Sequence, residues 1–357
     1  MKKLAFLMRL APLALAILLL GIGPSLLADS GANHRVRNLH FGVSGGNVKD
    51  KNTRFCCSGT LGSLVKNSSG TQYILSNNHV LGLAGSATVG DDISQPGLID
   101  NNCAIATVVA DFTVAPALTS NVDCAIAQLR PGLMDGTGFI EDIGTISSVV
   151  KTPSVGLSVA KSGRTSGFTT GSISSTSTTV SVRYPTSCGS NNGPVRTFTN
   201  QVVINSTTFS AGGDSGSLIV TNNTCHQPVA LLFAGSSTST IGNPISLVLT
   251  RLSSSLGSTV SFVGSTCSAS AATIESLGNG PSDASVEFAT AAMRAREQDL
   301  MSRPGVIGVG VSQADGNQQE AAILVYIDST AKVKTKLPKT ISGVKVQRIY
   351  SEPFVAF

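Results

Sequence analysis

The run Gly212-Gly213-Asp214-Ser215-Gly216 is the strongest chemical feature of the sequence. A nucleophilic serine needs an exposed hydroxyl, and backbone N–H groups directed at the oxyanion that forms when it attacks a carbonyl. The small residues on both sides of Ser215 would let a carbonyl group approach the main chain, and the N–H groups of Gly213 and Ser215 are the candidate donors. The same run is also typical of a glycine-rich turn before a strand, so the interpretation depends on companion residues.

Among the four histidines of the chain, His79 is the candidate general base for such a serine. His34 and His40 lie in a polar N-terminal stretch, and His226 follows a cysteine in a turn-like segment. His79 instead follows the apolar run Tyr73-Ile74-Leu75, at a predicted transition from strand to loop where functional side chains tend to lie. The alternative is an ordinary surface or core histidine held by a hydrogen bond.

Asp123 is the candidate carboxylate that would orient the imidazole and stabilise the imidazolium. It stands directly before the apolar run Cys124 to Leu129, and burial of an acid without a partner is costly. Asp92 and Asp111 are rivals with more polar surroundings, and an ordinary aspartate at a strand start or turn is the alternative.

The order His79, Asp123, Ser215, each in its own sequence context, resembles the chymotrypsin/trypsin family of serine proteases. Residues 55–263 carry the resemblance. The stretches 75–81 and 209–218 are similar to those of uncharacterised bacterial trypsin-like proteins. The resemblance implies a mainly β, double-barrel fold and peptide-bond hydrolysis through an acyl-enzyme, without a metal or other cofactor.

The run Ser162 to Gly167 resembles secreted bacterial members of the family, of the α-lytic protease type. The resemblance implies that Arg164 pairs with Asp214 and supports the loop of the nucleophile, because a buried carboxylate needs a cation and arginine offers a bidentate fork. The N-terminus would then not be needed as that cation. The alternative is a surface arginine in a glycine-rich turn.

The family pattern also indicates the primary pocket that receives the residue before the scissile bond. Phe209 would lie at its base, and Phe233, Ala234 and Gly235 would line its wall. No acid stands at these positions to receive lysine or arginine, so we expect a preference for small or apolar residues.

The composition agrees with a mainly β protein. The chain has 357 residues, of which 41% are hydrophobic and only 13% charged, and short runs of β-forming residues alternate with Gly, Ser, Asn and Pro clusters. This pattern predicts a barrel or sandwich. The net charge of +5 comes partly from the N-terminus, and no basic stripe with aromatic residues indicates nucleic-acid binding.

The N-terminus has the features of a secretory signal. The apolar stretch 10–20 is preceded by the basic residues Lys2, Lys3 and Arg9. Cleavage after Ala28 is expected, because a signal peptide ends in a small residue. The sequence therefore predicts a secreted or periplasmic protein, and an uncleaved membrane anchor is the alternative.

Seven cysteines follow this segment, and some of them should pair in an oxidising compartment. Cys188 could pair with Cys225, and Cys103 with Cys56 or Cys57, although sequence does not fix the connectivity. Cys124 fits a small buried apolar residue. The spacing offers no convincing metal site.

The domain organisation follows from changes in composition. The region 283–357 predicts a small α+β unit, separate from the β-rich part, with the order α-β-β-α-β. It could be a chaperone-like or inhibitory pro-segment, a binding module or a stabilising domain. The predicted segments are a signal peptide at 1–28, an N-terminal extension at 29–54, a protease domain at 55–265, a linker at 266–282, and, within the last unit, helices at 286–301 and 329–336.

Two functions remain at this point. The first is an active serine endopeptidase that acts on proteins or peptides, either free or held latent with residues 283–357 blocking its cleft. The alternative is a non-catalytic, secreted binding or adhesion protein on a protease fold. The presence of all three candidate catalytic residues favours the enzyme.

Overall fold

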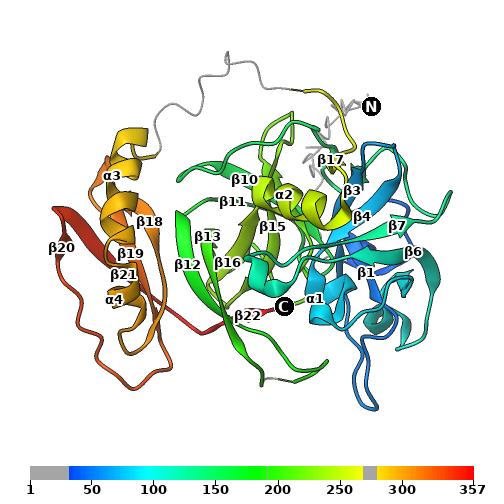
Figure 1. The fold of residues 1–357 in the computed structure, drawn as a ribbon, viewed down its shortest axis with the longest axis horizontal. Coiled ribbons are helices and arrows are strands. Elements are labelled where there is room, and N and C mark those ends of the chain that lie inside the picture. Colours follow the sequence, from blue (N-terminus) through cyan, green and yellow to red (C-terminus); the bar gives the residue numbers. More distant parts are fainter. Residues whose placement is uncertain (1–31, 191, 268–279) are drawn as a thin grey trace, which may run out of the picture.

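The computed structural model describes residues 32–190, 192–267 and 280–357 (Figure 1). The predicted signal peptide and most of the predicted linker lie outside the described residues. Two large, curled β-sheets lie side by side, as the mainly β composition predicts, and the double-barrel prediction is confirmed. Within the part of the chain that the structure describes, no helix is both long and apolar enough to cross a membrane.

The first sheet has eight strands in the order β17-β3-β4-β7-β6-β5-β1-β2. Strand β1 (Val43–Asn47) lies before residue 55, so the predicted N-terminal extension contributes a strand to the first barrel. The other strands are β2 (Gly59–Leu61), β3 (Ser63–Lys66), β4 (Gln72–Ser76), β5 (Asp92–Gln95), β6 (Thr107–Val114), β7 (Ala125–Leu129) and β17 (Ser261–Phe262).

The second sheet has twelve strands, and its main path is β11-β10-β14-β15-β16-β13-β12-β18-β19-β21-β20. The last strand, β22 (Phe354–Ala356), pairs with both β12 and β15. The other bounds are β10 (Ser158–Gly163), β11 (Gly167–Ser172), β12 (Ser175–Arg183), β13 (Val195–Asn205), β14 (Leu218–Thr221), β15 (Pro228–Gly235), β16 (Ser239–Pro244), β18 (Val306–Ala314), β19 (Asn317–Asp328), β20 (Thr340–Ile341) and β21 (Val344–Ser351). A separate pair joins β8 (Phe139–Ile140) to β9 (Gly144–Thr145).

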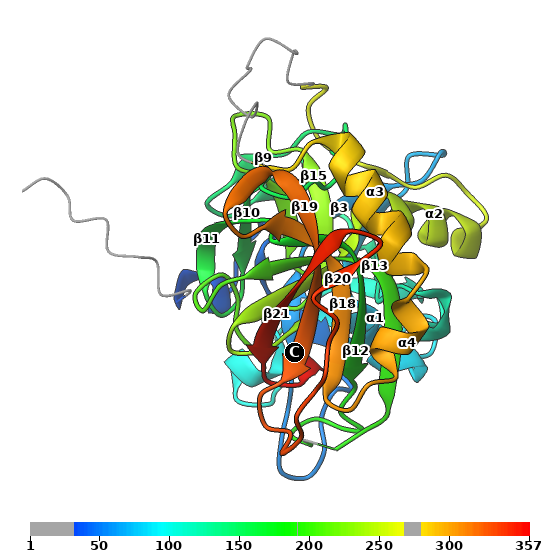
Figure 2. The same ribbon diagram turned by 90° about the vertical axis from the view of Figure 1, so that its left-hand side faces the viewer.

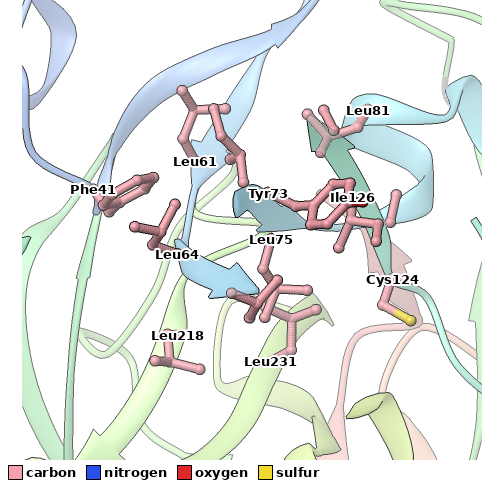
Figure 3. Packing of buried hydrophobic residues seen from close by; sticks show 14 of the residues in the cluster. Phe41, Leu61, Leu64, Tyr73, Leu75, Leu81, Cys124, Ile126, Leu218 and Leu231 are labelled. Atoms are coloured by element: carbon pink, nitrogen blue, oxygen red, sulfur yellow. The ribbon is translucent and has the colours of Figure 1, made fainter. Parts of the chain in front are cut away.

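One continuous core joins the two barrels. Leu75 of β4 lies close to Leu218 of β14 and Leu231 of β15, and all three side chains are at most 1% exposed (Figure 3). Burial of each such side chain contributes about 1.5–3 kcal/mol. This packing holds the ends of β4 and β7 in the first barrel against the loop before β14 in the second.

The helices are few. Helix α1 (Asn78–Leu81) begins one residue after β4, and α2 (Ile245–Leu256) follows β16 and buries Val248 and Leu252. Gly257, at φ +70°, ends α2 in the left-handed conformation that glycine adopts without strain. Short 3₁₀ helices occupy Ala32–Arg35, Leu83–Gly85, Leu98–Asn101 and Leu118–Ser120.

The C-terminal unit differs from the prediction of a separate α-β-β-α-β domain. Helices α3 (Asp283–Arg294) and α4 (Glu297–Met301) cover one face of β18 and β19, but β18 pairs with β12 and so continues the second sheet (Figures 1 and 2). The helix predicted at 329–336 is wrong, because this segment has no regular structure. Its lysines at 332 and 336 would repel each other on one helix face, and its threonines and valine have low helix propensity.

Candidate active site

His79 and Asp123 meet where the first barrel faces the second. His79 lies on α1 immediately after β4, and Asp123 lies two residues before β7, the strand that pairs with β4. His79 Nδ1 lies 2.6 Å from Asp123 Oδ2, and the backbone N–H of His79 donates to Oδ1 at 3.1 Å. The side chain of Asp123 is fully buried, so both oxygens of this carboxylate hold the imidazole and its backbone in one orientation.

Tyr184 and Asn243 complete the surroundings of Asp123, and no sequence pattern pointed to either of them. The hydroxyl of Tyr184, one residue after β12, donates to Asp123 Oδ2 at 2.8 Å. The side-chain oxygen of Asn243 accepts the backbone N–H of Asp123 at 2.9 Å. Burial and the nearby charge of Asp123 raise the pKa of Tyr184 well above its usual value, so the hydroxyl stays a proton donor. The second barrel thus helps to hold the acid of the first.

The pKa of His79 is raised above its usual value of 6.5. Burial lowers it, but the charge of Asp123 and the hydrogen bond to Asp123 outweigh that effect. Asp50 adds a smaller contribution of the same sign, and burial raises the pKa of Asp50 itself. An imidazole with a raised pKa, supported by a buried carboxylate, is suited to accept and return a proton near neutral pH.

Ser215 lies in the loop between β13 and β14, opposite His79 across the boundary of the two barrels. Its side chain is fully buried, and Oγ donates to the carbonyl oxygen of Phe233 at 3.2 Å. Among the described residues, no hydrogen bond joins Ser215 to His79. His79 Nε2 instead lies 3.0 Å from the carbonyl oxygen of Phe357.

Two carbonyl groups of the loop around Ser215 accept hydrogen bonds from the protein itself. Thr165 Oγ1 donates to the carbonyl of Gly212 at 2.7 Å, and the N–H of Ser217 donates to the carbonyl of Asp214 at 3.0 Å. In a trans peptide the N–H points opposite to the carbonyl, so the N–H groups of Gly213 and Ser215 each point away from the donor that holds the preceding carbonyl. Gly213 has φ +98°, a conformation that favours glycine and helps to form this turn.

The predicted pairing of Arg164 with Asp214 is wrong. Arg164 Nε and Nη2 donate to the two oxygens of Asp100 at 2.6 and 2.7 Å. The cation beside Asp214 is Lys161 of β10, whose Nζ lies 3.4 Å from Oδ2. Arg164 still lies beside the loop, because its Nη1 donates to Thr165 Oγ1, the group that holds Gly212.

Lys161 and Asp214 are both fully buried. Asp214 also accepts the N–H groups of Thr165 at 2.8 Å and Ala211 at 2.9 Å, so backbone donors supply much of its stabilisation. Burial lowers the pKa of Lys161, and the charge of Asp214 opposes this effect. Sequence reasoning missed Lys161, although a lysine that directly follows the apolar residues Val159 and Ala160 could have indicated a buried cation.

The predicted pocket residues fall into two groups. Phe209 is fully buried in a cluster with Val202 and Ile219, and Phe357 packs against this cluster. Phe233 and Ala234 point into another cluster, where the ring of Phe233 lies 5.0 Å from that of Phe198. Gly235 continues the same strand. The open cleft beside them is lined by residues of both barrels and the C-terminal end, among them His79, Gly213, Arg196, Ala356 and Phe357.

Three disulfides stabilise the described structure: Cys56–Cys103, Cys57–Cys188 and Cys225–Cys267. The first is one of the two predicted pairings of Cys103. The predicted pairing of Cys188 with Cys225 is wrong, because the loop after β12 brings Cys188 beside residues 52–57 of the first barrel. Cys124 is free and buried, as predicted, and burial raises the pKa of its thiol well above the usual value.

No family model matches the chain, and no curated protein matches it. Among solved structures, it is similar to a glutamic-acid-specific serine protease (19% identity, 62% of this chain and 98% of that chain, TM-score 0.44). It is also similar to protease A of Thermobifida fusca (18%, 63% and 98%, 0.42) and to a chymotrypsin of Cellulomonas bogoriensis (15%, 64% and 99%, 0.40). The two curled sheets, with the site at their boundary, give this chain a chymotrypsin-like architecture.

Proposed function

We propose that this chain is an exported serine endopeptidase that hydrolyses peptide bonds through Ser215, His79 and Asp123. The observation that carries the proposal is the 2.6 Å contact between His79 Nδ1 and the buried carboxylate of Asp123, at the boundary where Ser215 also lies. This contact fixes the imidazole with Nδ1 as the proton donor and leaves Nε2 directed at the cleft.

In the proposed reaction, the hydroxyl of Ser215 attacks the carbonyl carbon of a peptide bond while His79 Nε2 takes its proton. The oxyanion accepts hydrogen bonds from the N–H groups of Gly213 and Ser215. The C–N bond then breaks, His79 returns the proton to the leaving amine, and an ester to Ser215 remains. Water, activated by His79 in the same way, hydrolyses this ester and releases the acid.

One rearrangement is needed before the first step. The hydroxyl of Ser215 donates to Phe233, and Nε2 of His79 contacts Phe357. Rotation of the serine side chain about its Cα–Cβ bond, between staggered positions, would turn Oγ from Phe233 toward Nε2 once the contact with Phe357 is released. Catalytic hydrogen bonds often form only in the complex with substrate.

Export is supported by two independent features. The N-terminus has the composition of a secretory signal, and six of the seven cysteines form disulfides, which persist in oxidising compartments. We expect protein or peptide substrates, no cofactor, and no nucleic acid.

A fluorophosphonate probe tests the proposal, because it labels only a serine activated by its surroundings. We expect labelling of Ser215 in the protein and none in Ser215→Ala. Absence of labelling, also in Phe357→Ala, which removes the apolar ring contacts that hold the Phe357 backbone beside His79, would favour the alternative, a non-catalytic binding or adhesion protein on a protease fold. Labelling that survives Ser215→Ala would show that another residue is the nucleophile.

A further inference from the structure

The last residues of the chain lie in the candidate cleft as an added strand. Strand β22 runs between β15 and β12, antiparallel to the first and parallel to the second (Figure 1). On the β15 side, Ala356 lies opposite Ala234 and Val355 lies opposite Gly235. An extended segment held by a main-chain ladder is the general way in which a peptide binds to a strand edge.

The register of this ladder brings Phe357 to the reacting groups. If the antiparallel register is continued by one residue, Phe357 lies opposite Phe233. The carbonyl oxygen of Phe233 accepts a hydrogen bond from the hydroxyl of Ser215. The carbonyl oxygen of Phe357 lies 3.0 Å from His79 Nε2. The end of the segment therefore lies beside the imidazole, where the residue before a scissile bond must also lie. The side chain of Ser215 is fully buried in this arrangement.

The ring of Phe357 enters an apolar site that only a glycine permits. A Cβ atom at position 235 would lie 2.5 Å from Cζ of Phe357, so the ring packs directly on the backbone of Gly235. The ring also packs against the buried cluster that contains Phe209 and Ile219. The residues of that cluster are apolar and buried, so contact with them suits a large apolar side chain, whereas burial of an acidic or basic group there would be costly.

We propose that residues 354–357 are an intramolecular ligand of the cleft, bound as the acyl part of a substrate, and that the enzyme therefore cleaves after phenylalanine preceded by a small residue. This inference rests on the proposed function of the site. The predicted preference for small or apolar residues is thereby narrowed to a large aromatic residue. Since substrate and the C-terminal segment compete for the same strand edge and the same apolar site, the segment inhibits the enzyme.

The experiment uses the full chain, its Phe357→Ala variant and the control Tyr350→Ala. Tyr350 is an aromatic residue of β21, close in sequence but 59% exposed. The substrates are blocked p-nitroanilides of Phe-Val-Ala-Phe, Phe-Val-Ala-Glu and Phe-Val-Ala-Lys. We expect Phe357→Ala to cleave the first at least about tenfold faster than the other two. It should also cleave it at least about tenfold faster than the parent chain does, whereas Tyr350→Ala behaves like the parent.

Equal rates for Phe357→Ala, Tyr350→Ala and the parent would overturn the inhibitory role. A preference for glutamate or lysine would overturn the proposed specificity. Thermal unfolding verifies that the variants are folded, and Phe357→Asp provides a second variant in which a charge replaces the ring and should release the segment in the same way.

Failure of this inference differs from failure of the proposed function. Fluorophosphonate labelling without cleavage after phenylalanine would leave the serine protease and reject the specificity. If no variant is labelled, calorimetry with the free peptide Phe-Val-Ala-Phe still decides whether the cleft is a peptide site. Phe357→Ala should bind it at least about tenfold more tightly than the parent, and equal binding would reject the C-terminal segment as a ligand.

Discussion

Asp123 and Asp214 are both fully buried carboxylates on the two sides of the same site, but their partners differ in kind. Asp123 faces the imidazole of His79, which can gain and lose a proton, and the hydroxyl of Tyr184. Asp214 faces the ammonium group of Lys161 and several backbone N–H groups. The imidazole beside Asp123 can therefore change its charge during a reaction, whereas the partners of Asp214 only hold that carboxylate in place.

The difference shows how one site separates chemistry from support. A removed carboxylate at position 123 would leave the imidazole without its orienting partner, which affects the transition state. A removed carboxylate at position 214 would leave Lys161 buried without its counter-ion, which affects the folded state. Substitutions on the two sides of the site therefore separate an effect on the reaction from an effect on the stability of the fold.

Asp123→Asn should reduce the rate of fluorophosphonate labelling by about 10⁴-fold, because the amide favours the wrong tautomer of His79. Urea unfolding should show a much smaller change, since the amide can still accept from Tyr184. Labelling should be measured in a background that carries Phe357→Ala, so that the cleft is open in both proteins. A variant that labels at the parent rate would remove Asp123 from the mechanism.

Lys161→Met should lower the free energy of unfolding by about 3–5 kcal/mol, because the charge of Asp214 is left buried without its cation. The matched control is Arg130→Met, which breaks a half-exposed ion pair with Asp111 and should cost less than about 1 kcal/mol. Urea denaturation measures both. Equal effects would show that backbone donors alone stabilise Asp214.

Tyr184→Phe should reduce the labelling rate by about tenfold, since it removes one hydrogen bond to a charged group worth about 1.5–3 kcal/mol, part of which acts on the position of Asp123. The ring remains, so its packing is kept. The pH profile of labelling separates the two possible roles: a positioning role moves the inflection assigned to His79, whereas a purely structural role leaves it in place.

The titration of His79 should have the smallest effect on the free energy of unfolding and on the labelling rate. Its pKa in the folded state is raised above 6.5, so it contributes stability that is fully present below the unfolded pKa and is lost as the pH rises through the folded pKa. Labelling, which needs neutral His79, should rise over the same range. Imidazole NMR measures the pKa directly, and Asp123→Asn should lower it. An unchanged value in that variant would contradict the assignment of the cause.

Sequence reasoning selected the candidate site residues through their chemistry, and it missed several of their partners. His79 is conspicuous because it follows an apolar run, Asp123 because it precedes one, and Ser215 because it lies in a glycine-rich run. Tyr184 lies 61 residues from Asp123, and its role depends on the way in which β12 curls back to the first barrel. No local pattern encodes such a contact.

The errors in the sequence predictions have the same origin. Arg164 and Lys161 are three residues apart on the same segment, and only the twist of β10 decides which of them reaches Asp214. The α+β nature of the C-terminal unit followed from its own periodicity. Its attachment to β12 did not, because an exposed strand edge has no signature that names its partner.

The pairing of β18 with β12 keeps the C-terminal segment close to the cleft of its own molecule, and so determines the effective concentration of the segment at that cleft. A segment carried on the same sheet as its binding site has a fixed effective concentration, typically in the millimolar range or above for short connections. Dilution of the protein therefore does not release it, and neither does a modest excess of substrate. Release requires a change within one molecule, such as a cut in the irregular stretch 329–339 or separation of β18 from β12. The fraction of active molecules therefore depends on how many chains have been cut or have opened in this way, and not on the protein concentration.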